Sequence, residues 1–145
     1  MRLDPRFRNA VYSTFFLLFV TGAAWVAADQ LKDAPTAGEI WQLTAAYLLM
    51  THGGGAMATL ILLGVLIPVH IQRGWRGRRN RVAGAAMLAC NALLVVTAFG
   101  LYYAGSEALR PWLSRIHIII GFSLPVLWAV HVVAGRRALP GDRRT

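Results

Sequence analysis

The chain has 145 residues, of which 57% are hydrophobic and only 14% are charged. Ordinary soluble domains of this size do not show that balance, so the composition excludes them. A formal net charge of +9 is also typical of nucleic-acid-binding proteins. The arginines, however, stand in short blocks between long apolar runs, which is typical of membrane topology and argues against nucleic-acid binding. By length, residues 1–145 form one domain.

Four uncharged apolar runs predict four membrane helices, with spans at about 10–28, 40–72, 82–104 and 112–135. Each has at least the ~18 residues that a membrane helix requires. The second is longer than one crossing needs, which predicts a strong tilt or a projection beyond the bilayer. Short connections favour an all-α, up-down-up-down four-helix bundle. The first run ends like a cleavable secretory signal, but its length favours an uncleaved helix.

Charge is distributed unevenly among the connections. Twelve of the fifteen basic residues lie in the N-terminus, the middle loop and the C-terminal tail, whereas four of the six acids lie in the other two loops. The twelve are Arg2, Arg6, Arg8, Arg73, Arg76, Arg78, Arg79, Arg81, Arg136, Arg137, Arg143 and Arg144. The positive-inside rule therefore places both termini in the cytoplasm.

Two local signals predict where helices begin. Thr36 and Glu39 have the spacing of a capping box before the second span. Pro111 suits the first turn of the fourth helix, because its missing N–H would have no partner there.

All four histidines of the sequence lie in the second and fourth spans. His117 and His131 are fourteen residues apart, within roughly 40° of four whole helical turns, so both imidazoles lie on one face. His52 and His70 are eighteen residues apart, about five whole turns, and also share a face. Because ionisable side chains inside a membrane are costly, two phased pairs indicate a function.

The histidines also pair by level, because the second and fourth spans run in the same direction. His52 pairs with His117 on the periplasmic side, and His70 pairs with His131 on the cytoplasmic side. Two imidazoles at each level suit a six-coordinate haem iron, so we expect two haems. They would be b-type, because the single cysteine, Cys90, permits no Cys-x-x-Cys-His attachment. Zinc binding and plain hydrogen bonding between helices remain open alternatives.

The two spans do not separate their histidines equally. The rise is about 27 Å between His52 and His70 but about 21 Å between His117 and His131. A tilt, unwinding at the glycines after His52, or a kink at Pro68 would absorb the difference. If none does, one pairing is wrong and a single haem binds.

Glycines and arginines near the histidines suit the same cofactor. Three glycines would allow the close backbone approach that a flat macrocycle needs, although small residues also serve ordinary helix packing. Three arginines are placed to meet haem propionates, or else only to anchor the helix ends. The glycines are Gly53, Gly54 and Gly121, and the arginines are Arg73, Arg76 and Arg115.

With these spans and histidines the chain resembles the small four-helix membrane cytochromes b. These are the bacterial cytochrome b-561 type and the related gamma subunits of formate dehydrogenase and nickel-iron hydrogenase. The resemblance covers all four spans and is most specific from the segment WLSRIH, residues 112–117, through His131. It implies His117 and His131 as haem ligands, in a multi-pass protein of the bacterial inner membrane. The b-561 proteins take a ligand from the first helix, which has no histidine here, so His70 would serve instead.

We therefore expect a dihaem cytochrome that carries electrons across the membrane. Its partners would be membrane lipid, quinone, and a periplasmic redox protein or a larger redox complex. Bis-histidine iron has no open position, which suits electron transfer. One alternative is superoxide oxidation with quinone reduction, which outer basic residues would favour by steering, but the outer loops set four acids against Lys32 and Arg110. Another alternative is a haem-free scaffold or assembly subunit.

Overall fold

The computed structural model describes residues 4–77 and 80–137, and every regular element within them is helical. The elements are α1 (Pro5–Leu31), α2 (Gly38–Leu66), a π-helical turn η1 (Ile67–Ile71), α3 (Gln72–Arg76), α4 (Arg81–Tyr103) and α5 (Arg110–Arg137). The predicted all-α class is therefore confirmed. Five of the arginines used for the charge argument lie outside the described residues: Arg2, Arg78, Arg79, Arg143 and Arg144.

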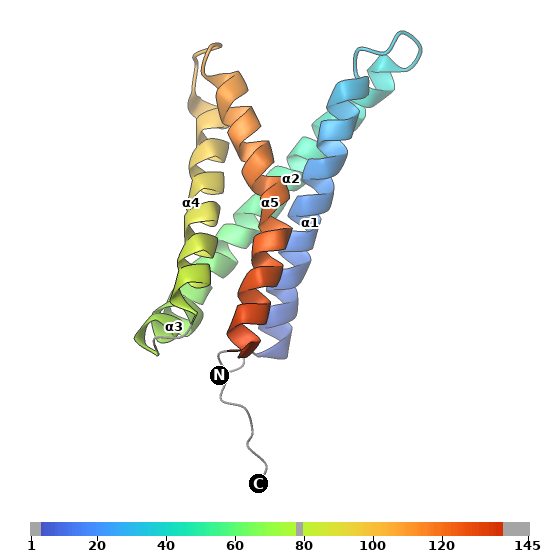
Figure 1. Ribbon diagram of the computed structural model, residues 1–145. Helices are drawn as coiled ribbons and strands as arrows, with labels where there is room; N and C mark the ends of the chain where they lie inside the picture. Colours follow the sequence, from blue (N-terminus) through green and yellow to red (C-terminus); the bar gives the residue numbers. More distant parts are fainter. Residues whose placement is uncertain (1–3, 78–79, 138–145) are drawn as a thin grey trace. The chain divides into compact units, whose positions relative to one another are not determined.

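The helices form two compact units, with the boundary after His70. In the first unit α1 packs against α2, and in the second α4 packs against α5. Each pair is antiparallel, as the ribbon of each pair shows (Figure 1). The antiparallel order predicted for consecutive spans is therefore confirmed within each pair, while the single domain and the facing of the second and fourth spans stay predictions.

Two helices, α1 and α5, begin with side chains that suit a helix N-terminus. The third, α2, does not have the cap that the sequence predicted. The Asp4 side chain caps α1 by accepting from the backbone N–H groups of Arg6 and Phe7 at 2.9 and 3.2 Å, and Pro111 lies in the first turn of α5 as predicted. The capping box at residues 36–39 is wrong. The N-cap of α2 is Ala37, with no side-chain hydrogen bond, so Thr36 lies one residue too early to cap.

Four helices are long and apolar enough to cross a membrane: Pro5–Leu31, Gly38–Arg76, Arg81–Tyr103 and Arg110–Arg137. Many of their large apolar side chains face outward, Phe16, Met57 and Ile61 among them at about 70% exposure. Small or weakly polar residues occupy most of the buried positions instead: Val11, Thr21, Ala28, Ala45, Gly55, Thr59, Asn91 and Thr97. That distribution is typical of membrane helices, which pack through small residues and leave large ones to lipid. The chain is a multi-pass membrane protein with four candidate spans.

The continuous helix that crosses into the second unit contains a wide turn at its proline. Pro68 has no N–H to give to the carbonyl of Gly64, and the backbone adopts a π-helical turn over Ile67–Ile71. A kink at Pro68 is one of three predicted ways to absorb the unequal histidine spacings. The structure has a π-helical turn there, and the compensation itself stays a prediction. His70 lies in this turn, so the regular phase calculated from His52 holds only as far as Leu66.

Candidate functional site

His52 is held against α1 by one hydrogen bond and one glycine. Its Nδ1 lies 3.0 Å from the Oγ1 of Thr21. The adjacent Gly22 leaves room for the ring, because a Cβ built there would lie 3.1 Å from the Cε1 of His52. The backbone of Leu18 is a further hydrogen-bond partner of the ring. The imidazole is half-buried between the two helices, with its orientation fixed from the α1 side.

His117 repeats this arrangement in the other pair of helices. Its Nδ1 lies 2.9 Å from the Oγ1 of Thr97 on α4, and the ring is half-buried. Thr97 itself is 4% exposed, so the hydrogen bond is sheltered within the helix pair. Each unit thus holds one histidine through Nδ1 on a buried threonine of the neighbouring helix.

His131 also faces α4 but has different partners. The Asn80 amide nitrogen donates to the His131 carbonyl oxygen at 2.9 Å and lies 3.4 Å from its Nδ1. Asn80 precedes α4 and has a left-handed backbone, with φ of 49°, which asparagine tolerates better than most residues. Gly84 leaves ordinary contact space beside the ring.

Because His117 also contacts α4, the predicted common face of these two histidines is confirmed.

His70 differs from the other three. It is exposed and lies in the π-helical turn η1, whereas His52, His117 and His131 are half-buried in regular helices. Pi-helical turns often coincide with functional positions. The structure therefore places His70 in a turn whose backbone differs from the regular helices that carry the other three histidines.

The predicted pairings join histidines of different units. His52 belongs to the first unit and His117 to the second, while His70 ends the first unit and His131 lies in the second. The pairings therefore stay predictions. Among the described residues, no three His, Cys, Asp or Glu side chains gather as they would around a single metal ion. The zinc alternative stays open.

The glycines that lie beside histidine rings, Gly22 and Gly84, are not the glycines that the sequence predicted. Gly54 has open space around it, and the nearest atom to a Cβ at Gly121 is in Leu94, at 4.0 Å. Gly53 lies half-buried in α2. The roles predicted for these glycines toward a macrocycle stay predictions.

Sequence reasoning missed the residues that position the rings, namely Thr21, Gly22, Asn80, Gly84 and Thr97. A signal for some of them was present in the sequence. Thr21-Gly22 and Thr97 interrupt apolar runs that otherwise contain few hydrogen-bonding side chains. Only the packing of neighbouring helices identifies which histidine each one meets.

The predicted propionate partners lie at the helix ends. The Arg115 guanidinium stacks over the Trp112 ring on the same helix, 5.4 Å from its centroid. Arg73 and Arg76 are exposed. An arginine stacked on an interfacial tryptophan fits helix anchoring, and the propionate roles stay predictions.

Lys32 and Arg110, the basic residues weighed for the superoxide alternative, each bond a nearby group of the chain. Lys32 forms an ion pair with Asp29 at 2.8 Å, and the hydrogen bond to Asp29 raises the pKa of Lys32 above its usual value. Arg110 donates to the carbonyl oxygen of Leu101 at 2.8 Å. The ion pair offsets the charge of Lys32, whereas Arg110 keeps its full positive charge, so the superoxide alternative stays a prediction.

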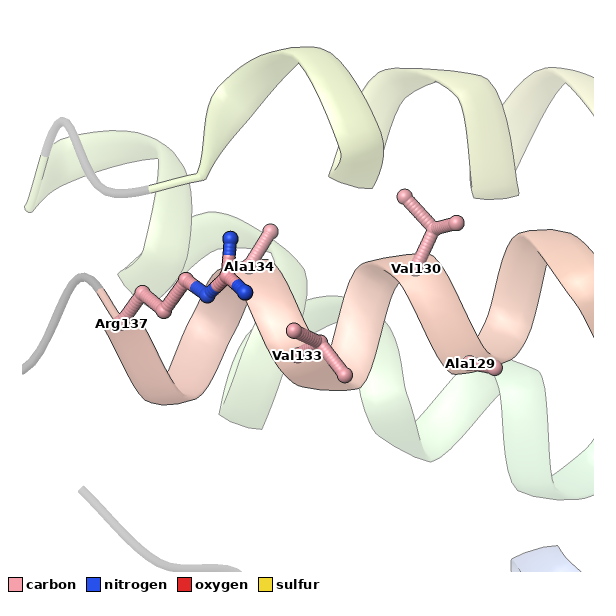
Figure 2. Close-up of a pocket in the computed structure, with 5 residues that line it drawn as sticks. All are labelled: Ala129, Val130, Val133, Ala134 and Arg137. Carbon is pink, nitrogen blue, oxygen red and sulfur yellow. The ribbon is translucent and has the colours of Figure 1, made fainter.

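An open apolar groove runs along the C-terminal part of α5. Ala129, Val130, Val133 and Ala134 line it, and the charged end of Arg137 lies at its border (Figure 2). An arginine at the end of an apolar helix face can extend its head group toward the membrane surface.

Comparison with known proteins gave no match: no protein-family model, no curated protein and no solved structure matches the chain.

Proposed function

We propose that this membrane protein binds b-type haem through its histidines and carries electrons across the bilayer. His52 and His117 would ligate one haem on the periplasmic side, and His70 and His131 a second on the cytoplasmic side. Such a haem would supply one-electron chemistry, because iron with two axial histidines alternates between ferric and ferrous without an open position. Quinone and a periplasmic redox protein or larger redox complex are the proposed exchange partners, in a bacterial inner membrane.

The observation that carries this proposal is the anchoring of the imidazoles. Nδ1 of His52 and of His117 each bond a threonine of the neighbouring helix. The Asn80 amide nitrogen lies 3.4 Å from Nδ1 of His131 and bonds the backbone carbonyl oxygen of the same residue. Histidines that bind metals commonly use one nitrogen for the metal and the other for such a bond, which fixes the ring. The donor set is also purely imidazole, which suits bis-histidine haem.

The residues of this chain would hold the rings still during electron transfer. Thr21 and Thr97 are buried, so water does not compete for their hydrogen bonds. Gly22 and Gly84 let the rings of His52 and His131 approach the adjacent helix. Fixed ligands keep the change in geometry between two oxidation states small, which favours rapid electron exchange.

The absorption spectrum of the purified full chain tests the proposal. We expect sharp reduced α and β bands of low-spin b-type haem, and a pyridine haemochrome value of two haems per chain. A value near one would reject the dihaem form and leave a monohaem carrier. A chain that carries no haem after expression with ample haem supply would overturn the proposal and favour the scaffold alternative.

Single substitutions test the assignment of ligands. His52→Ala and His117→Ala should remove or convert the same low-spin signal, because those two histidines share an iron. His70→Ala and His131→Ala should affect the other. If His70→Ala leaves both signals intact, the pairing of His70 with His131 is wrong. A ligand outside the four histidines is then required.

A further inference from the structure

Thr21 and Thr97 make the same set of hydrogen bonds in two separate helix pairs. Thr21 Oγ1 lies 2.7 Å from the carbonyl oxygen four residues before it and 3.0 Å from Nδ1 of His52. Thr97 Oγ1 lies 2.7 Å from the corresponding carbonyl oxygen and 2.9 Å from Nδ1 of His117. Each hydroxyl therefore has a backbone partner and an imidazole partner at nearly identical distances.

The hydroxyl can donate to only one of these partners. A threonine hydroxyl carries one hydrogen and two lone pairs. A distance of 2.7 Å is usual for O–H···O, whereas 2.9–3.0 Å is usual for N–H···O. Each hydroxyl also lies near a second carbonyl oxygen of its own helix, at 3.3 Å for Thr21 and 3.1 Å for Thr97. This geometry favours donation of the hydroxyl hydrogen to the helix carbonyls, which leaves its oxygen to accept a hydrogen from Nδ1. A neutral imidazole protonated at Nδ1 carries its lone pair on Nε2.

We propose that Thr21 and Thr97 are positioning residues that hold His52 and His117 in the Nδ1–H tautomer, so that Nε2 is the metal-binding nitrogen. The consequence for iron rests on the proposed function. A hydrogen bond from Nδ1–H raises the basicity of the ligand. A more basic imidazole stabilises ferric iron over ferrous, so both threonines lower the reduction potential of the haem that His52 and His117 share.

His131 and His70 have surroundings that differ from those of His52 and His117. The Asn80 nitrogen, 3.4 Å from Nδ1 of His131, carries only donor hydrogens, and the backbone of Ala83 is a further hydrogen-bond partner of the His131 ring. His70 is exposed in the π-helical turn. The threonines should therefore influence one haem and leave the other unchanged.

The first arm of the test reads the tautomer directly. ¹⁵N NMR of the full chain with labelled histidines, in detergent and reduced with dithionite, should show His52 and His117 protonated at Nδ1. Low-spin ferrous haem is diamagnetic, so the same spectrum is readable with or without the cofactor. Protonation at Nε2 alone in either histidine would overturn the inference, whether or not the chain binds haem.

The second arm measures reduction potentials of the holoprotein. Thr21→Val and Thr97→Val should each raise the potential of the same haem, or weaken its binding by roughly 10–100-fold. Thr21→Ser, which keeps the hydroxyl, should restore the value of the unmodified protein. Thr59→Val is the matched control, because Thr59 is equally buried and its hydroxyl bonds the Gly55 carbonyl at 2.9 Å.

Each outcome of the second arm has one interpretation. Unchanged potentials and binding in both valine variants would overturn the inference while leaving haem binding established. An equal effect of Thr59→Val, or a loss that Thr21→Ser does not repair, would show a packing role and also overturn it. A protein without any haem would refute the proposed function, and the tautomer would still be measured.

Discussion

The absence of a side chain at Gly22 allows α1 and the His52 ring to approach closely. A Cβ at Gly22 would lie 3.1 Å from Cε1 of His52, whereas a Cβ at Gly84 would lie 3.8 Å from Cε1 of His131. The first distance requires the ring to move, and the second is ordinary van der Waals contact. The two glycines therefore form a matched pair with opposite expectations.

We predict that Gly22→Ala destabilises the protein by about 1–3 kcal/mol, the usual cost of overpacking a tight contact. Gly84→Ala should be neutral or stabilising by up to ~1 kcal/mol, because alanine favours the helix and no neighbour must move. Thermal unfolding in detergent, together with haem content per chain, measures both. Equal melting temperatures for the two variants would contradict the role assigned to Gly22.

At the scale of the element, the wide turn at Pro68 decides where His70 lies. A regular helix from His52 would bring His70 back to the same face after eighteen residues. The π-helical turn over Ile67–Ile71 interrupts that regularity, because each of its hydrogen bonds spans one more residue than in an α-helix. The eighteen-residue spacing alone therefore does not fix the direction of His70 relative to His52.

Replacing Pro68 tests this role. Pro68→Ala restores an N–H that can bond the carbonyl of Gly64, so we expect a regular α-helix and a rotated His70. The low-spin signal assigned to His70 should shift or disappear, as in His70→Ala, while the signal of the other haem stays. Pro35→Ala, in the connection before α2, serves as the control and should change neither. An unaltered spectrum in Pro68→Ala would show that the turn does not determine ligation.

The continuous helix Gly38–Arg76 also bears on how the chain crosses the bilayer. Its 39 residues extend to about 58 Å at 1.5 Å per residue, against a hydrocarbon core of about 30 Å. The helix must tilt or project, as its composition predicted. Trp75 and Arg81, which stack at 5.3 Å, form the kind of aromatic and basic contact that membrane surfaces favour.

At the scale of the whole molecule, four membrane crossings would put both termini on the same side. The uneven distribution of basic residues assigns that side to the cytoplasm. Reporter fusions at Thr145 and in the 29–39 loop should therefore read opposite sides, with the C-terminal fusion cytoplasmic. A fusion at Arg79 should agree with Thr145, since both follow an even number of crossings. Reporters at Thr145 and in the 29–39 loop that read the same side would contradict the four-span topology.

The helical class and the span boundaries were accessible from sequence because they depend on local composition. In lipid every backbone group must find a partner within the chain, so a long apolar run has little choice but a helix. The four runs at 10–28, 40–72, 82–104 and 112–135 each fall within a helix of the structure, except at their edges. The common face of His117 and His131 followed from the helical repeat alone.

Contacts between helices were not accessible in this way. The partnership of Thr21 with His52, thirty-one residues apart, and of Thr97 with His117, depends on the register in which two helices pack. Small residues permit many such registers, and side-chain shape across the interface selects one. The sequence by itself determined four apolar helices and the common face of His117 and His131. Tertiary structure decided which polar side chain holds each ring, because that choice is made by packing between segments far apart in the chain.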